Sequence, residues 1–99
     1  MRIAICDDDK SIREGIKGML ENNADLPGNV CVFEASSGIE LIDEHKVDPF
    51  DIIFLDIEMD GMDGMEAGQE IRKIDKDVII KQLSMNMNMT YLSNALKCK

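Results

Sequence analysis

Two apolar runs in the chain end directly in acidic residues. The run Ile3–Cys6 continues into Asp7–Asp9. A second run, Ile52–Leu55, continues into Asp56. Short, Ile-rich runs are typical of buried strands in a parallel sheet, and such sheets bind ligands at the carboxyl ends of their strands. Carboxylates gathered there repel one another, so the group must take up a proton or bind a cation. Mg2+, a hard ion that prefers oxygen ligands, fits such a group best.

Asp56 also has the setting of a nucleophile. A carboxylate can attack a phosphoryl group if its charge is partly offset and the donor is held in line. The strand before Asp56 would present it beside Asp7 and Asp8, which could hold the cation. The alternative is that Asp56 only caps the loop that follows, which is the commoner role of a single acid after a strand. The second acidic run favours the site.

Spacing argues against two other kinds of site. The segment Asp56–Gly61 begins like the calcium loop of an EF-hand, but its twelfth position, which must be acidic, is Ala67. No Gly-x-x-x-x-Gly-Lys-Ser/Thr loop follows any apolar run, so nucleotide binding has no support. His45, the only histidine, is expected to be a solvated residue or one at the C-terminus of a helix rather than a catalyst.

Strand-like and helix-like segments alternate along the chain. Four segments are expected to form strands: Ile3–Cys6, Val30–Phe33, Asp51–Asp56 and Val78–Leu83. Four are expected to form helices: Ser11–Asn22, the residues after Ser37 and before Pro49, Met65–Ile74, and Thr90–Lys97. The capping-box spacings Ser11-x-x-Glu14 and Ser37-x-x-Glu40 mark the first two helix starts. This alternation predicts an α/β fold, a doubly wound parallel sheet with right-handed crossovers and helices on both faces.

Apolar spacing predicts the side of each helix that faces the sheet. For the first helix these residues are Ile12, Ile16, Met19 and Leu20. The third helix has a weaker stripe, formed by Met65, Gly68, Ile71 and Ile74. In the second helix the apolar residues after the capping box are Ile39, Leu41 and Ile42. The segment Glu58–Gly64 is expected to be a loop, and the tract Met85–Met89 is interpreted as the entry to the fourth helix.

Size and composition limit the classes of function. The 99 residues make one small domain, and any effector domain is expected outside this chain. A net charge of -9, from 20 acidic and 11 basic residues, argues against direct binding to nucleic acid or an anionic membrane. No apolar run approaches a membrane span. Cys6 and Cys31 lie in apolar runs and are expected to be buried, which predicts a soluble protein in the reducing cytoplasm.

These residues resemble the receiver domain of two-component response regulators, and the resemblance covers essentially the whole chain. It implies a flavodoxin-like or CheY-like sheet of order 2-1-3-4. Asp7 and Asp8 fall on the family's metal-binding pair, and Asp56 falls on its phosphoacceptor. The resemblance also assigns the backbone carbonyl of Glu58 to the Mg2+ ion. It places Ser84 on the switch hydroxyl that contacts the phosphoryl group.

The two ends of the sequence suggest a subfamily and a departure from the family pattern. Segments Ile3–Asp9 and Met89–Leu92 look most like regulators of the accessory-gene-regulator type, whose effector half is a LytTR DNA-binding domain. The family has a fifth strand, ending in a lysine that contacts the phosphoryl group, and a fifth helix. This chain stops before either, so the receiver is expected to be C-terminally incomplete, and neither Lys97 nor Lys99 takes that lysine's role. The edge of the fourth strand, which carries Lys81, would then be open to pairing.

The resemblance implies a phosphoacceptor rather than an enzyme. A sensor histidine kinase would transfer a phosphoryl group to Asp56 with Mg2+, and the output would be transcription. A homodimer through the fourth strand's edge or the fourth helix is a further expectation. One alternative is a receiver-like interaction or dimerisation module that is not phosphorylated. Another, a small Mg2+-dependent phosphohydrolase, would need a second catalytic acid, which here would be Glu58, and acid-base loops that the sequence lacks.

Overall fold

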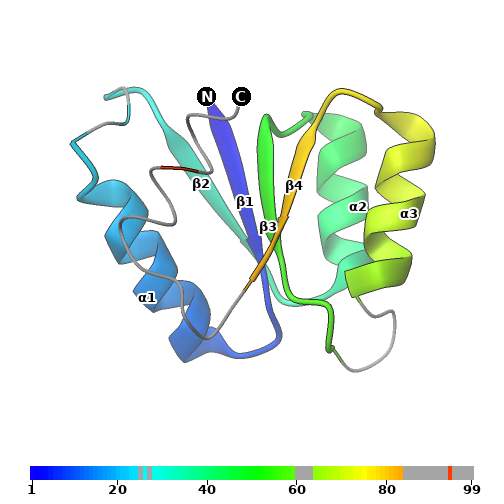
Figure 1. The fold of residues 1–99 in the computed structure, drawn as a ribbon, viewed down its shortest axis with the longest axis horizontal. Helices are drawn as coiled ribbons and strands as arrows, with labels where there is room; N and C mark the ends of the chain where they lie inside the picture. The colour runs from blue at the N-terminus through cyan, green and yellow to red at the C-terminus, as the bar shows by residue number, and fades with distance from the viewer. Residues whose placement is uncertain (25, 27, 60–63, 84–93, 95–99) are drawn as a thin grey trace.

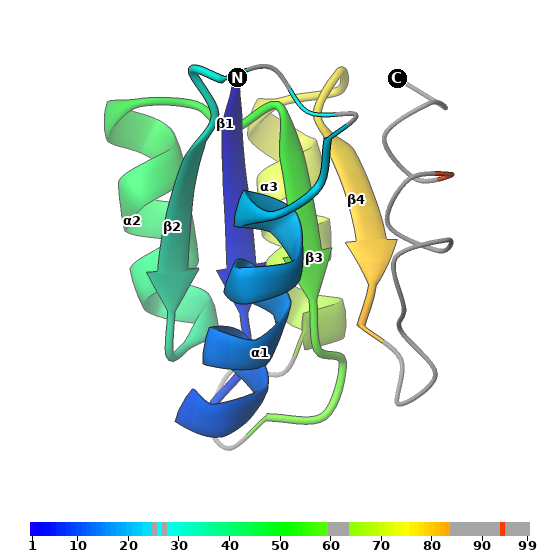
Figure 2. The same ribbon diagram turned by 90° about the vertical axis from the view of Figure 1, so that its left-hand side faces the viewer.

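The computed structural model describes residues 1–24, 26, 28–59, 64–83 and 94, which form a three-layer α/β domain. The strands are β1 (Arg2–Cys6), β2 (Cys31–Ala35), β3 (Ile52–Leu55) and β4 (Ile79–Gln82). The helices are α1 (Lys10–Glu21), α2 (Gly38–Val47) and α3 (Gly64–Ile74). All paired strands are parallel, in the order β2-β1-β3-β4, as Figure 2 shows. Helix α1 covers one face of the sheet, and α2 and α3 cover the other (Figure 1). The predicted doubly wound sheet and its order are confirmed.

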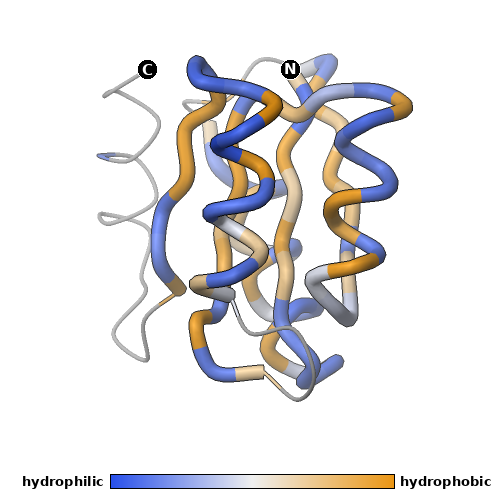
Figure 3. Tube along the Cα trace, turned by 90° about the vertical axis from the view of Figure 1, so that its right-hand side faces the viewer, coloured by the Kyte–Doolittle hydropathy of each residue, from blue (hydrophilic) through white to orange (hydrophobic). Residues whose placement is uncertain are grey.

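The two central strands bury side chains on both faces. Because successive strand residues point to opposite sides, the alternate residues of β1 and β3 enter two separate cores. Under α1 lie Ile3, Ile5, Ile16, Leu20, Ile52 and Phe54. On the side of α2 and α3 lie Ala4, Cys6, Leu41, Ile53, Leu55, Ala67 and Ile71. Figure 3 shows these strands as hydrophobic along their length. Burial on both faces explains why the two runs are continuously apolar.

The first helix is capped by a different residue from the one predicted. Asp9 is the N-cap of α1, and its Oδ1 accepts hydrogen bonds from the backbone N–H groups of Ser11 (2.9 Å) and Ile12 (3.4 Å). Asp9 directly precedes the helix and has the extended backbone typical of an N-cap residue. Ser11 is already inside the helix, so it is not the N-cap. Ser37 caps α2 as predicted, because its Oγ accepts a hydrogen bond from the N–H of Glu40 at 3.1 Å.

The apolar stripe predicted for the third helix is wrong at both ends. Met65 is 66% exposed and Ile74 is 52% exposed. The buried residues of α3 are Gly64, Ala67 and Ile71. Two of these have little or no side chain, which allows the helix to approach the sheet closely. A prediction based on large apolar residues therefore misses the face of α3 that packs against the sheet.

Exposed apolar residues also occur in the first two helices. Ile12 of α1 is exposed, although it was predicted to share the apolar face of its helix, and Ile39 of α2 is exposed as well. Ile12 lies in the first turn of α1, which extends beyond the carboxyl ends of the strands (Figure 2). Cys31 is exposed because it opens the edge strand β2, whereas Cys6 is fully buried on the central strand β1.

His45 is buried, contrary to the prediction of a solvated side chain, although it does lie in the last turn of α2. Its Nδ1 accepts a hydrogen bond from the backbone N–H of Phe50 at 3.1 Å. Nε2 must therefore carry the proton, which it donates to Asp75 Oδ2 at 3.0 Å. Asp75 Oδ1 in turn accepts from the N–H groups of Asp77 and Val78 just before β4. This chain of bonds joins the ends of α2 and α3 to the start of β4.

Some predictions lie outside the described residues. These are Ser84, the tract Met85–Met89 and the helix Thr90–Lys97. In the described part of the chain, no helix is both long enough and apolar enough to cross a membrane.

Candidate functional site

The parallel sheet places the two acidic runs side by side. Its hydrogen bonding continues one residue past the strands, where the N–H of Asp7 donates to the carbonyl of Ala35 at 3.1 Å. The N–H of Asp56 donates in the same way to the carbonyl of Cys6 at 2.9 Å. Asp7 and Asp56 therefore leave neighbouring strands at the same level, at the carboxyl edge of the sheet.

Three carboxylates meet at this edge. One oxygen from each of Asp7, Asp8 and Asp56 lies within 4.8 Å of the others. Asp7 is buried, Asp56 is half-buried and Asp8 is exposed. The cluster therefore has a buried wall formed by β1 and an open side from which a solute can enter. We call these three residues the acidic cluster.

The electrostatics of the acidic cluster favour a proton or a cation. Burial raises the pKa of Asp7 above its ordinary value, and the neighbouring charges of Asp56 and Asp8 raise it further. The N–H of Asp9, which donates to Asp7 Oδ1 at 2.8 Å, acts in the opposite direction. A divalent cation would reverse this balance, because it offsets the repulsion that disfavours ionised Asp7.

The backbone after Asp56 folds back onto its side chain. Asp56 Oδ1 accepts a hydrogen bond from the N–H of Glu58 at 3.0 Å. The next residue, Met59, is buried, and its Sδ lies 3.8 Å from Sγ of Cys6. Burial raises the pKa of the Cys6 thiol to about 12, so it is a neutral packing group beneath the acidic cluster. The bond from Glu58 thus holds one of the two Asp56 oxygens in place.

The donor set fits Mg2+. All three side chains offer carboxylate oxygens, the ligand type that Mg2+ prefers. Two oxygens bound to one Mg2+ at 2.0–2.1 Å lie at most about 4.2 Å apart. The oxygens of the acidic cluster lie within 4.8 Å of one another, so they would move closer together or bind partly through water to share one ion.

Sequence reasoning missed two residues at this edge. The first is Arg13, whose Nη1 donates to the backbone carbonyl of Asp7 at 2.7 Å. The second is Gly64, which sits so close to Asp56 that a Cβ there would lie 2.6 Å from the Asp56 carbonyl carbon. The sequence places Gly64 at the end of the motif around Asp56 and in the expected loop Glu58–Gly64, but it does not indicate this contact. The only feature of the sequence that points to Arg13 is its position as a cationic residue one helical turn after the acidic run Asp7–Asp9.

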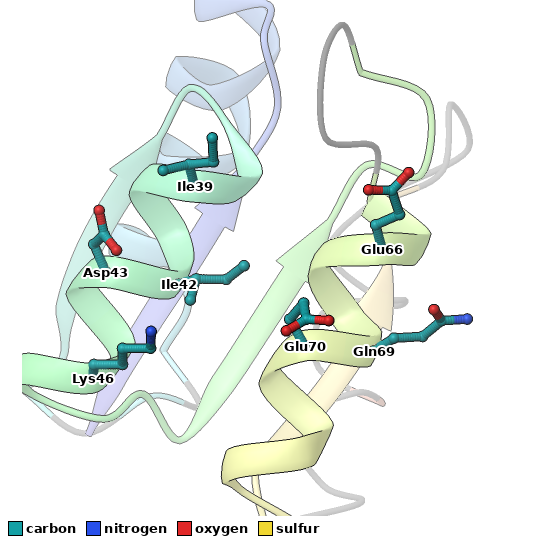
Figure 4. A pocket seen from close by; sticks show the side chains of 7 residues that line it. All are labelled: Ile39, Ile42, Asp43, Lys46, Glu66, Gln69 and Glu70. Carbon is teal, nitrogen blue, oxygen red and sulfur yellow. The ribbon is translucent and has the colours of Figure 1, made fainter.

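A separate groove of about 320 Å³ lies between α2 and α3 (Figure 4). Its lining residues are Ile39, Ile42, Asp43, Lys46, Glu66, Gln69 and Glu70. None belongs to the acidic cluster, and the mixed charges of the lining do not converge on one ligand chemistry. The groove is therefore distinct from the candidate site.

The sequence matches the family model described as the response regulator receiver domain over residues 3–99. It is 30% identical over 86 residues to the response regulator UvrY of Escherichia coli strain K12, covering 87% of this chain and 38% of UvrY. It is 32% identical over 96 residues to the chemotaxis protein CheY of Bacillus subtilis strain 168, covering 97% of this chain and 77% of CheY. The chain thus spans well under half the length of UvrY.

Among solved structures, the response regulator protein TrrA of Thermotoga maritima, in complex with Mg2+ and BeF, is similar to this chain. The TM-score is 0.83 at 27% sequence identity, and the alignment covers 98% of this chain and 96% of TrrA. The alignment covers nearly all of this chain and so includes the sheet that brings Asp7 and Asp56 together. With a family match that covers nearly every residue, this chain belongs to the response regulator receiver domain family.

Proposed function

We propose that this chain accepts a phosphoryl group from a sensor histidine kinase onto Asp56. Asp7, Asp8, Asp56 and the backbone carbonyl of Glu58 would hold Mg2+. The supporting observation is the convergence of three carboxylate oxygens within 4.8 Å at the carboxyl edge of the sheet, with Asp56 half-buried and Asp8 exposed. TrrA, a structural relative, is described in complex with Mg2+ and BeF. In this role the chain is a phosphoacceptor and not an enzyme acting on a separate substrate.

The hydrogen bond to Asp56 Oδ1 supports different roles for the two oxygens of this carboxylate in the proposed reaction. The N–H of Glu58 holds Oδ1, so Oδ2 attacks the phosphorus of the donor in line. A bond forms between Oδ2 and phosphorus as the phosphorus–nitrogen bond of the phosphohistidine breaks, and the nitrogen leaves with the electron pair. Mg2+, held by Asp7, Asp8 and Asp56, would supply positive charge that offsets the charge on the transferred phosphoryl group. The exposed position of Asp8 leaves the open side of the site for the donor.

Incubation with acetyl phosphate and Mg2+ tests this proposal directly. The mass of the intact chain should rise by one phosphoryl group, and Asp56→Asn should abolish the gain. Asp43→Asn, which removes a carboxylate from the distant groove of Figure 4, is the matched control and should be phosphorylated normally. Unchanged labelling of Asp56→Asn would overturn the assignment. If Mg2+ bound and no adduct formed, the alternative of a receiver-like interaction module would hold instead.

The finer assignments rest on the sequence resemblance. We propose that Ser84 is the switch hydroxyl and that the output is transcription through a LytTR-type DNA-binding domain, in a cytoplasmic protein. The supporting features are the segments Ile3–Asp9 and Met89–Leu92. Beryllofluoride should shift amide resonances beyond the acidic cluster in the wild-type chain, and Ser84→Ala should confine those shifts to the cluster. Identical shifts in both proteins would refute the role of Ser84.

Self-association is a further proposal. We propose that phosphorylation changes pairing between two copies, through the edge of β4, where Lys81 lies, or through the predicted helix Thr90–Lys97. The supporting feature is the sheet order, in which β4 pairs only with β3 among the described strands. Light scattering with and without beryllofluoride would measure the molar mass. An unchanged monomer under both conditions would exclude this mode of regulation.

A further inference from the structure

Arg13 reaches from the first turns of α1 to the backbone of the acidic cluster. Its side chain is only 13% exposed, and its Nη1 donates to the carbonyl oxygen of Asp7 at 2.7 Å. A distance this short lies at the strong end of charge-assisted hydrogen bonds. The bond ends on a main-chain atom, so it leaves the carboxylate oxygens of the acidic cluster available to a ligand.

The carbonyl that Arg13 holds belongs to the peptide unit between Asp7 and Asp8. This unit is planar, so fixing its oxygen fixes the rotation of the whole plane. Asp7 is attached to one end of the plane and Asp8 to the other. The orientation of that plane therefore decides whether the two carboxylates converge on one point. The N–H of Asp7 is already bound to the carbonyl of Ala35, so Arg13 completes the restraint on this turn.

A second contact braces the guanidinium from the other side. Arg13 Nε lies 3.5 Å from Oε1 of Glu34 on β2, and Lys17 Nζ lies 3.8 Å from Oε2 of the same residue. Glu34 pairs with Ile5 in the register of β1 and β2. Arg13 is thus hydrogen-bonded to the Asp7 carbonyl and ion-paired with Glu34. The contact with Glu34 is not a hydrogen bond, because Arg13 Nε is buried without a hydrogen-bond partner among the described residues. Lys17 shares only the ion pair with Glu34.

We propose that Arg13 is a positioning residue for metal binding, which fixes the Asp7–Asp8 peptide so that both carboxylates face a shared cation. The proposal rests on the proposed function for the identity of the cation as Mg2+. Positioning and a simple charge effect predict opposite changes in Mg2+ affinity when Arg13 is removed. Removing a cation near three carboxylates should, on Coulomb grounds, tighten Mg2+ binding. Removing a positioning contact should weaken it.

The test compares Arg13→Met with Lys17→Met, two variants that lose the same charge and the same bridge to Glu34. Mg2+ alone is titrated by calorimetry into each purified chain, and urea unfolding measures the free energy of unfolding separately. Arg13→Met should weaken Mg2+ affinity by about tenfold or more, the usual effect of removing a residue that orients metal ligands. Lys17→Met should bind as tightly as the wild type or slightly more tightly. Arg13→Lys should recover part of the affinity.

A kinetic measurement separates positioning from a general structural role. Saturating Mg2+ should restore the maximal rate of labelling by acetyl phosphate in Arg13→Met, because a lower affinity is overcome by concentration. A structural defect would lower the maximal rate as well. Unchanged or tighter Mg2+ binding by Arg13→Met, or equal weakening in Lys17→Met, would overturn the proposal.

Two further results have defined meanings. If Arg13→Met does not fold, Arg13→Lys carries the test, and Mg2+ binding equal to the wild type in that variant would count against positioning by the guanidinium contact with the Asp7 carbonyl. If the wild-type chain binds no Mg2+, the metal site of the proposed function fails together with this inference. Phosphorylation of wild-type Asp56 with unaltered Mg2+ affinity in Arg13→Met would refute the role of Arg13 alone.

Discussion

The close approach of Gly64 to the Asp56 backbone makes a strong prediction about a single methyl group. A Cβ at residue 64 would lie 2.6 Å from both the Asp56 carbonyl carbon and the Ile57 Cα, and closer still to the Asp56 carbonyl oxygen. Ordinary contacts of this kind begin at 3.4 Å. In Gly64→Ala, the backbone of α3 or of the segment after β3 would therefore have to move by well over 0.8 Å, because the contact with the carbonyl oxygen is the tightest of the three.

Both sides of this contact are backbone, so no side chain can rotate away to relieve it. Overpacking typically costs 1–3 kcal/mol, and this rigid case belongs at the upper end, about 3 kcal/mol of destabilisation. The same movement would shift Asp56 relative to Asp7. We therefore also expect the folded fraction of Gly64→Ala to be phosphorylated more slowly than the wild type.

Gly68→Ala, in the same helix, is the matched control. A Cβ there would lie 3.5 Å from Leu55 Cδ2, an ordinary contact. Replacing glycine by alanine inside a helix should raise the free energy of unfolding by about 0.5–1 kcal/mol. Urea unfolding followed by far-ultraviolet circular dichroism would compare the two variants. Wild-type stability in Gly64→Ala, or equal effects at both positions, would refute this account of the α3 approach.

Three other predictions follow from the same structure. Alkylation of the native chain at pH 8 should modify the exposed Cys31 and spare Cys6, whose pKa is about 12, and peptide mass spectrometry would detect any modification of Cys6 that contradicts this. The hydrogen bond from the Asp77 N–H lowers the pKa of Asp75 below its ordinary value of 3.8. The ionised carboxylate therefore stabilises the folded chain fully at a pH above 3.8, and this stabilisation is lost as the pH falls through the pKa of the folded state. Asp75→Asn should therefore destabilise the chain more at pH 7 than at pH 3, and an equal difference at both values in urea unfolding would disprove the linkage. Asp8→Asn should stabilise the Mg2+-free chain by about 1 kcal/mol, because it removes one of three repelling carboxylates, while a loss of stability in thermal unfolding would be the contrary result.

The sequence by itself determined the architecture and the edge that carries the acidic cluster. Strands β1 and β3 are buried on both faces, so their residues must be continuously apolar, and that pattern is visible without a structure. Because all four strands run parallel, acids that follow two neighbouring strands must emerge at one edge. The convergence of Asp7, Asp8 and Asp56 follows from local patterns and this general rule.

Other features depend on which distant segments come together, and only the tertiary structure decided them. His45 is buried because Asp75, at the end of α3, and the N–H of Phe50 satisfy both ring nitrogens. The face of α3 is set by Gly64 and Ala67, where the absence of large side chains permits close packing, so a search for large apolar residues selects the wrong side.

The same limit applies to the residues that support the acidic cluster. The sequence shows that Arg13 is a cation one helical turn after an acidic run, a pattern that a solvated helix face would share. Its importance lies in the direction of one guanidinium nitrogen toward the Asp7 carbonyl at 2.7 Å. The same guanidinium forms an ion pair with Glu34 on β2, which is distant in sequence but lies on the strand next to β1. Local patterns determined which groups could bind a cation, and three-dimensional packing decided how those groups are held.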